Sequence, residues 1–284
     1  GLPETVAGCT VNRLCASGLQ AVMDVSRALK LGEGEVYIAG GVESMTRAPL
    51  VMSKPSSGFG RDSKMHDSTF GWRFTNPKLA AMHPPYAMGE TAENVNDKYG
   101  ITREEQDAFS HRTQLKYEAA HESNAFGDEI IPVSIPRRKQ DPLVVDKDEH
   151  PRLSPPEILA KLRPAFRENG SVTAGNASGL NDGAAAVLLA NDEACERFGL
   201  KPLARVVSYA VAGVPPEIMG MGPVPATHKA LQRAGLQIED IGLVELNEAF
   251  AAQAIACIRE LGLDESIVNV NGGAIALGHP LGCT

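Results

Sequence analysis

The clearest hydrophobic pattern in the chain begins immediately after Cys15. Gly32 stands at the end of this pattern, where a glycine commonly stops a helix. The pattern predicts an amphipathic helix that begins just after Cys15 and continues to about Lys30. The positions that recur at helical spacing are Leu19, Val22, Met23, Ser26 and Leu29.

Short apolar runs bounded by glycine, proline and polar residues predict strands. A second helix is predicted over residues 227–234, where Gly235 stops it. Helices that alternate with strands in this way indicate the α/β class. The predicted strands at 35–39, which ends at Gly40 and Gly41, and at 184–190 are expected to be buried, and others are expected at 204–211, after Pro202, and at 267–270.

Residues 45–175 differ from their surroundings, because proline, serine, glycine and charge are frequent there and the apolar runs are short. We interpret this stretch as an inserted, loop-rich domain. Its clearest helix begins at residues 102–105, whose Thr-x-x-Glu spacing is that of a capping box. Two edge strands are expected, at 130–135 and 143–145, because each is near a proline. The basic cluster 137–139 between them is typical of a solvated turn, with a phosphate-binding patch as the alternative.

A pattern in the first part of the chain recurs 232 positions later. An identical spacing across a helix, a strand and a glycine pair indicates a duplicated α/β unit. Cys15 and Asn247 would then stand at equivalent helix starts, and a site between the two halves is expected. The first half would comprise 1–44 and 176–201, and the second 202–284. The matching positions are Leu14 with Leu246, Cys15 with Asn247, Val36 with Val268, Ile38 with Val270, and Gly40-Gly41 with Gly272-Gly273.

Composition narrows the class of protein. The 284 residues carry a net charge of -8, which argues against a nucleic-acid partner and against a polybasic membrane anchor. No run of eighteen apolar residues occurs, so no membrane span is predicted. The five cysteines are scattered and show no Cys-x-x-Cys or Cys/His spacing, so neither a disulfide framework nor a metal site is expected. A reducing compartment, the cytoplasm, fits this cysteine usage.

Two residues carry candidate chemistry. The thiol of Cys15 would lie at a helix N-terminus, where unpaired N–H groups and the helix dipole favour the thiolate. The small residues 16–18 would let a substrate approach closely. The alternative is a buried cysteine that acts as a small hydrophobic residue. His279 lies between Gly278 and Pro280, which would hold its ring in one place, and its alternative is a turn-capping imidazole.

Three motifs together resemble the thiolase family, the coenzyme A-dependent acyltransferases that make or cleave a β-ketoacyl thioester. They are Cys15-Ala16-Ser17-Gly18, Asn247-Glu248-Ala249-Phe250 and Gly278-His279-Pro280. The resemblance extends over essentially the whole chain, including residues 40–45, 173–183 and 219–223. It implies a duplicated α/β core in five layers, αβαβα, with an inserted loop domain. It also implies a homodimer or a homotetramer.

The resemblance assigns roles to individual residues. Cys15 would take the acyl group as a thioester, and His279 would activate that cysteine. His279 and a water held by Asn247 would stabilise the oxygen on which negative charge develops. Ser178 would contact the pantetheine arm of coenzyme A. Met88 and Met219 would line its tunnel and Arg152 would lie at its nucleotide end. The family uses coenzyme A thioesters as substrates and requires no further cofactor and no metal.

The sequence departs from the family pattern at its ends. Thiolases use a second cysteine in a Cys-x-Gly segment near the C-terminus, and this sequence stops at Thr284 before that segment. Cys283 is expected to serve packing. The first strands of the first half are also expected before Gly1. The 284-residue chain alone is therefore expected to be inactive, and the full-length protein active.

Substrate choice and two competing functions stay open at this point. Ala87 precedes Met88 where thiolases specialised for acetoacetyl-CoA often have histidine, and residues 67–74 resemble degradative thiolases, including the β-ketoadipyl-CoA type. One alternative is a β-ketoacyl synthase, which normally has a second histidine where Asn247 stands. The other is a non-catalytic thiolase-like protein that binds acyl-CoA.

Overall fold

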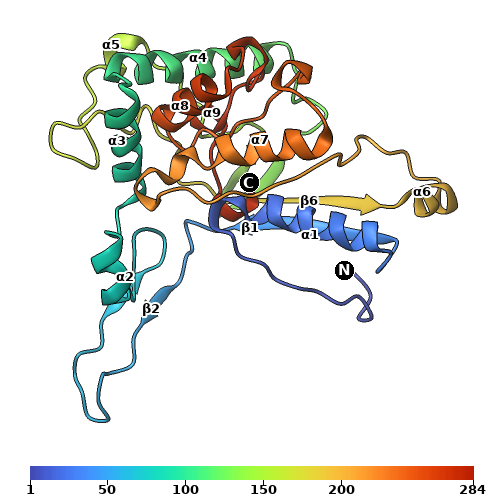
Figure 1. The fold of residues 1–284 in the computed structure, drawn as a ribbon, viewed down its shortest axis with the longest axis horizontal. Helices are drawn as coiled ribbons and strands as arrows, with labels where there is room; N and C mark the ends of the chain where they lie inside the picture. Colours follow the sequence, from blue (N-terminus) through green and yellow to red (C-terminus); the bar gives the residue numbers. More distant parts are fainter. The chain divides into compact units, whose positions relative to one another are not determined.

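A computed structural model describes all residues from 1 to 284, and they fold into two compact units (Figure 1). The chain passes between the units several times, so each unit is built from separate segments. Unit 1 comprises Gly1–Arg47, Leu180–Tyr209 and Pro280–Thr284, and unit 2 comprises Ala48–Gly179 and Ala210–His279.

Unit 1 is a helix packed against a pair of strands. The long helix α1 spans Ser17–Leu31 and ends at Gly32, whose φ of 71° is the left-handed conformation expected of a helix-ending glycine. Strand β1 (Val36–Glu43) pairs antiparallel with β6 (Gly183–Ala190) in a two-stranded sheet. The unit is completed by the turn η1 (Leu14–Ala16), the helix α6 (Asp192–Phe198) and the turn η5 (Leu281–Cys283).

Glycines in three elements of unit 1 form a cradle for the segment 280–284. A Cβ at Gly18 of α1 would lie 2.6 Å from the carbonyl oxygen of Cys283. One at Gly41 of β1 would lie 2.2 Å from the carbonyl oxygen of Gly282, and one at Gly183 of β6 would lie 2.4 Å from Cγ of Pro280. Heavy atoms cannot approach so closely, so this segment packs in place because these three residues lack side chains.

Unit 2 is mainly helical and contains two small hairpins. Strands β2 and β3 pair antiparallel, as do β4 and β5, with an irregularity between Ile135 and Arg137. Its elements in chain order are β2 (Leu50–Met52), β3 (Met65–Asp67), α2 (Pro77–Met82), α3 (Met88–Tyr99), α4 (Arg103–Glu122), β4 (Val133–Arg137), β5 (Gln140–Val145), α5 (Pro156–Leu159), η2 (Pro216–Met221), α7 (Pro223–Ala234), η3 (Ile238–Asp240), α8 (Ala251–Leu261), η4 (Glu265–Ile267) and α9 (Ala274–Leu277).

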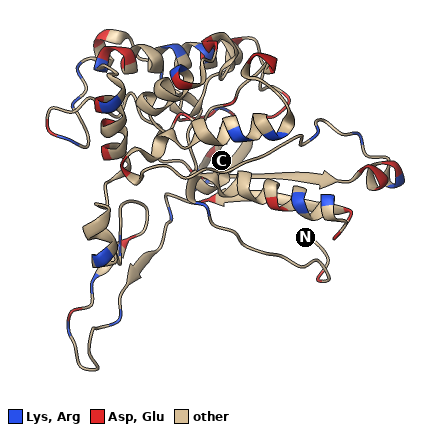
Figure 2. Ribbon diagram, viewed as in Figure 1, with Lys and Arg blue, Asp and Glu red and all other residues tan.

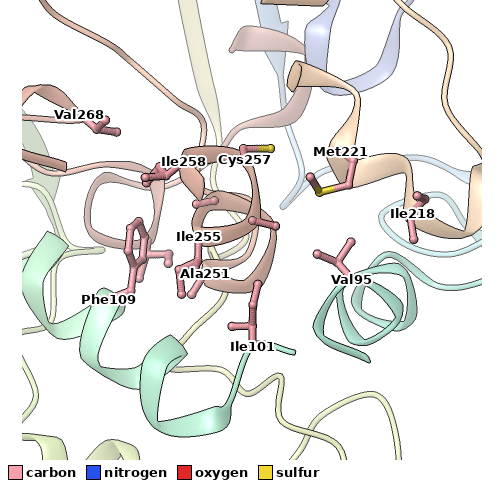
Figure 3. Packing of buried hydrophobic residues seen from close by; sticks show 13 residues of the cluster. Val95, Ile101, Phe109, Ile218, Met221, Ala251, Ile255, Cys257, Ile258 and Val268 are labelled. Carbon is pink, nitrogen blue, oxygen red and sulfur yellow. The ribbon is translucent and has the colours of Figure 1, made fainter. Parts of the chain in front are cut away.

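The hydrophobic core of unit 2 surrounds α8. Every residue of α8 except Arg259 and Glu260 is buried, so this helix has neighbours on all sides. Figure 3 shows Phe109 of α4, Val95 of α3 and Met221 of η2 around it. Burial of such side chains stabilises a fold by about 1.5–3 kcal/mol each. The core therefore fixes the position of α8.

The two longest helices occur where the sequence predicts them. Helix α1 confirms the helix expected after Cys15. Helix α4 begins with the expected capping box, in which the Thr102 hydroxyl accepts from the N–H of Glu105 and the Glu105 carboxylate accepts from the N–H of Thr102. A cap of this kind contributes about 1 kcal/mol. Helix α7 contains the expected helix 227–234 and begins four residues earlier, at Pro223.

Several strand predictions are wrong in detail. Residues 204–211 form no strand, because no other strand lies beside them to complete their hydrogen bonds. Residues 267–270 form only an isolated parallel bridge between Val244 and Val268. Strands β1 and β6 exist but are largely exposed rather than buried, since they form a sheet of two strands only.

Cys15 and Asn247 were predicted to lie at equivalent helix starts, but their distances from the helices that follow them differ. Helix α1 begins two residues after Cys15, whereas α8 begins four residues after Asn247.

Acidic and basic residues are interspersed along the helices of the chain (Figure 2). The salt bridges include one between Arg103 and Asp107 within α4 and one between Arg259 of α8 and Glu105 of α4. No helix is long and apolar enough to cross a membrane.

Candidate active site

Cys15 lies in a sharp turn that is fixed by its neighbours. Leu14 has a φ of 50°, a conformation that residues other than glycine rarely adopt. The side chain of Asn12 accepts a hydrogen bond from the N–H of Leu14 at 2.9 Å, and the Ser17 hydroxyl donates to the carbonyl of Leu14 at 2.6 Å. The same hydroxyl accepts from the N–H of Arg13 at 2.9 Å. These bonds hold the backbone that presents Cys15 just before α1.

Burial raises the pKa of the Cys15 thiol, and the nearby carboxylate of Glu43 raises it further, while a hydrogen bond from the cysteine's own backbone lowers it. The sequence led us to expect the opposite, because a helix N-terminus favours the thiolate. Desolvation of a charged sulfur outweighs the helix end here. A base that removes the proton is therefore needed before this thiol can act as a nucleophile near neutral pH.

Gly18 has a different role from the one expected of it. Its missing side chain gives room to the backbone of Cys283 and Thr284 rather than to a substrate. Glu43 fixes the same segment, because its carboxylate accepts a hydrogen bond from the N–H of Gly282 at 3.0 Å. The Cys15 turn, the end of β1 and the segment 280–284 thus form one packed part of unit 1.

Asn247 and His279 meet in unit 2. The amide Nδ2 of Asn247 lies 3.3 Å from Nε2 of the His279 ring, and the histidine is only 3% exposed. Gly278, with a φ of 100°, makes the turn between α9 and the histidine. When the amide donates to Nε2, the ring is neutral and carries its proton on Nδ1. The single lone pair of Nε2 accepts from the amide in this arrangement, so this nitrogen can take up a proton when that hydrogen bond is released.

Sequence patterns suggest no role for the carboxylate of Glu248, the residue that follows Asn247. Glu248 is 1% exposed, and burial raises the pKa of its carboxyl group, although hydrogen bonds from Asn269, Ile275 and Thr113 lower it. Its only sequence signal is its place next to Asn247 in the motif 247–250.

Ser178 lies on a loop that is hydrogen-bonded to the residues after Asn247. Its N–H donates to the carbonyl of Ala249 at 3.0 Å and its hydroxyl donates to the same carbonyl at 3.1 Å. The buried side chain of Asn176 fixes this loop, since it donates to Asp107 at 3.0 Å and accepts from the N–H of Thr173 at 2.7 Å. The loop and the segment of Asn247 are therefore held together.

The remaining predicted binding residues all lie in unit 2 with partly or fully exposed side chains. Met88 is the first residue of α3 and is 41% exposed, and Met219 lies in η2 and is 43% exposed. The helix α3 and the turn η2 pack against each other. Arg152 is exposed, and its backbone N–H donates to Gln114 at 3.0 Å. No group of three or more His, Cys, Asp and Glu residues could hold a metal ion.

Comparison with known proteins agrees with this fold and these motifs. The structure matches that of human mitochondrial 3-ketoacyl-CoA thiolase with a TM-score of 0.88 and 43% identity, over 99% of this chain and 70% of that one. It matches an acetyl-CoA acetyltransferase of Bacillus anthracis with a TM-score of 0.88 and 46% identity, over the same shares of the two chains. The expected α/β fold of the thiolases is thereby confirmed.

The family models cover almost the whole chain. Residues 1–193 match the N-terminal domain of thiolase and residues 200–284 match its C-terminal domain. A beta-ketoadipyl-CoA thiolase of Acinetobacter baylyi is 54% identical over 287 residues, which are 100% of this chain and 72% of that protein. An acetyl-CoA acetyltransferase of Syntrophomonas wolfei is 51% identical over 295 residues, 99% of this chain and 71% of that protein.

The chain belongs to the thiolase family, whose members are enzymes that transfer acyl groups to and from coenzyme A. The expected class of enzyme is thus confirmed. The inserted domain at 45–175 and the boundary between 201 and 202 stay predictions, as do the roles of the individual site residues.

Proposed function

We propose that this protein makes or cleaves β-ketoacyl-CoA through an acyl-Cys15 intermediate, with His279 and Asn247 as the other catalytic residues. The observation that carries the proposal is the buried pair of Asn247 and His279, whose facing nitrogens lie 3.3 Å apart. A thiol whose pKa is raised requires such a base, and Cys15 is a thiol of this kind.

The first half-reaction follows from these groups. His279 Nε2 takes the proton of the Cys15 thiol, and the sulfur attacks the carbonyl carbon of an acyl-CoA. The resulting oxyanion accepts hydrogen bonds from His279 and from a water that Asn247 holds, which stabilises the developing charge. When the carbonyl re-forms, the bond to the coenzyme A sulfur breaks and the proton passes from His279 to that sulfur. The products are acyl-Cys15 and free coenzyme A.

We extend the proposal to the binding of coenzyme A, to the cellular compartment and to the oligomeric state. Ser178 contacts the pantetheine arm, Met88 and Met219 line its tunnel, and Arg152 lies at the nucleotide end. Support comes from the hydrogen bonds that join the Ser178 loop to Ala249, two residues after Asn247. Acyl-CoA and coenzyme A are the small-molecule partners, and no further cofactor is required. We place the enzyme in the cytoplasm as a homodimer or homotetramer.

The test is a brief exposure of the full-length protein to acetyl-CoA, followed by mass spectrometry. We expect a single acetyl adduct that maps to the peptide of Cys15. The peptides of Cys9, Cys195, Cys257 and Cys283 are internal controls and should stay unmodified. A folded protein that binds coenzyme A but forms no adduct would contradict the proposal and favour a non-catalytic acyl-CoA-binding protein.

The substrate is expected to be a longer or carboxylated β-ketoacyl-CoA rather than acetoacetyl-CoA. Ala87 precedes Met88 where a histidine is common in enzymes specialised for acetoacetyl-CoA, and several relatives at 52–55% identity are beta-ketoadipyl-CoA thiolases. We expect kcat/KM for β-ketoadipyl-CoA to exceed that for acetoacetyl-CoA by at least about tenfold, which corresponds to 1.4 kcal/mol of differential binding in the transition state. A preference for acetoacetyl-CoA in steady-state kinetics would overturn this assignment.

A further inference from the structure

We propose that Glu248 is a positioning residue for the acyl transfer, because its buried carboxylate ties the segment that carries Asn247 to the segment that leads to His279. The inference rests on the proposed function, in which these two residues act on the same oxygen. Glu248 itself does not face the reacting atoms in this proposal. It acts by fixing the two backbones between which the catalytic pair is held.

Residues from three separate parts of the chain donate hydrogen bonds to the Glu248 carboxylate. Oε1 accepts from Nδ2 of Asn269 at 2.8 Å and from the hydroxyl of Thr113 at 3.0 Å. Oε2 accepts from the N–H of Ile275 at 3.2 Å and lies 3.1 Å from the same hydroxyl. Ile275 belongs to α9, and His279 follows four residues later. One carboxylate therefore connects the residue after Asn247 with the helix before His279.

The two side chains that serve Glu248 also hold the neighbouring backbone. The Asn269 side chain accepts from the N–H of Leu246 and donates to its carbonyl, both at 2.8 Å. The Thr113 hydroxyl accepts from the N–H of Gly273 at 2.8 Å, just before α9. Asn247 is thus fixed from the residue before it and from the residue after it. The start of α9 is fixed at Gly273 and at Ile275.

The packing leaves little freedom for this arrangement to shift. A Cβ at Gly273 would lie 2.2 Å from Cδ of Glu248 and 2.5 Å from Nδ2 of Asn269. Since Glu248 is 1% exposed, water cannot replace a lost hydrogen bond easily. A change at the carboxylate must therefore be taken up by movement of the Asn247 segment, of α9, or of both. Displacements of about 1 Å at a reacting pair can reduce turnover about 100-fold.

A matched set of variants of the full-length enzyme tests the proposal. Thr113→Val keeps the shape of the side chain but removes the hydroxyl, Thr113→Ser keeps the hydroxyl, and Glu248→Gln places an amide where the carboxylate accepted hydrogen bonds. Val95→Ala serves as the control for lost stability, because Val95 is a fully buried core residue of α3 outside this network. Steady-state kinetics, thermal unfolding and ¹⁵N NMR of the histidine ring are measured for each variant.

Thr113→Val and Glu248→Gln are expected to lower kcat about 10- to 100-fold with KM changed less than about threefold. They should also shift the ¹⁵N resonance of His279 Nε2, which reports its contact with Asn247. Thr113→Ser should keep kcat within about threefold of the wild type, and Val95→Ala should lower the melting temperature with kcat within about twofold.

Two results would overturn the inference. The first is a His279 resonance that is unchanged in both Glu248→Gln and Thr113→Val. The second is a fall in kcat of the same size in Val95→Ala, when the melting temperature of that control falls equally. The NMR measurement does not depend on turnover. A wild-type enzyme that forms no acetyl adduct would contradict the proposed function, and the position of Glu248 would still be tested by the resonance.

Discussion

Replacing Cys15 with alanine is expected to lower the turnover of the full-length enzyme at least about 10,000-fold. Loss of a nucleophile removes the covalent route altogether, and in enzymes that act by acyl transfer such losses reach about a million-fold in kcat. Coenzyme A release in a continuous thiol assay measures the effect. Binding of coenzyme A should change little, because the Cys15 side chain forms no hydrogen bond that holds another residue of unit 1 in place.

Cys9→Ser is the matched control for this variant. Cys9 is an exposed cysteine six residues before Cys15, so its loss removes a thiol without touching the turn. We expect this control to keep kcat within about twofold. Equal activity of Cys15→Ala and the wild type would refute the covalent mechanism.

Replacing His279 with alanine is expected to slow acylation of Cys15 about 1,000-fold at pH 7. A positioned base contributes about 100- to 10,000-fold. Burial raises the pKa of the Cys15 thiol above its ordinary value, so little of the thiol is ionised at pH 7 without a base. Single-turnover mass spectrometry of the acetyl adduct measures the rate.

The acylation rate of the His279→Ala variant is expected to rise with pH. Below the pKa of the thiol, each pH unit raises the thiolate fraction about tenfold, so the acylation rate of His279→Ala should rise about tenfold per unit between pH 6 and pH 8. The wild type should show a shallower dependence, because His279 removes the proton. His228→Ala, which changes an exposed histidine of α7, should follow the wild type. A flat profile for His279→Ala would mean that this residue is not the base.

The helices could be predicted from the sequence because their signals are local. The spacing of apolar residues after Cys15 and the capping box at Thr102 depend on residues within a few positions of each other. The three catalytic candidates were likewise identified from short motifs. The structure then brings Asn247 and His279 together, from positions 32 residues apart in the chain.

The role of Glu248, the pKa of Cys15 and the burial of the strands depend on contacts between distant residues, which a single sequence does not reveal. Glu248 has partners 21, 27 and 135 positions away, and its place in the motif 247–250 does not show that its carboxylate is buried. The raised pKa of Cys15 has the same origin, because burial of a side chain is a property of the packed molecule. The apolar strands 35–39 and 184–190 were expected to be buried, but each has only one partner strand in the sheet.

The pairing of β1 with β6 sets the order in which the molecule can form. Glu43 pairs with Gly183, 140 residues later, and Val36 with Ala190, 154 residues later. Closing a loop of that size costs on the order of 4 kcal/mol, so contacts within the long helices form first. At a synthesis rate of about 5–20 residues per second, β6 follows α1 from the ribosome after roughly ten to thirty seconds. During that interval α1 lacks the strand pair against which it packs, and the Cys15 thiol lacks the burial that it has in the folded protein.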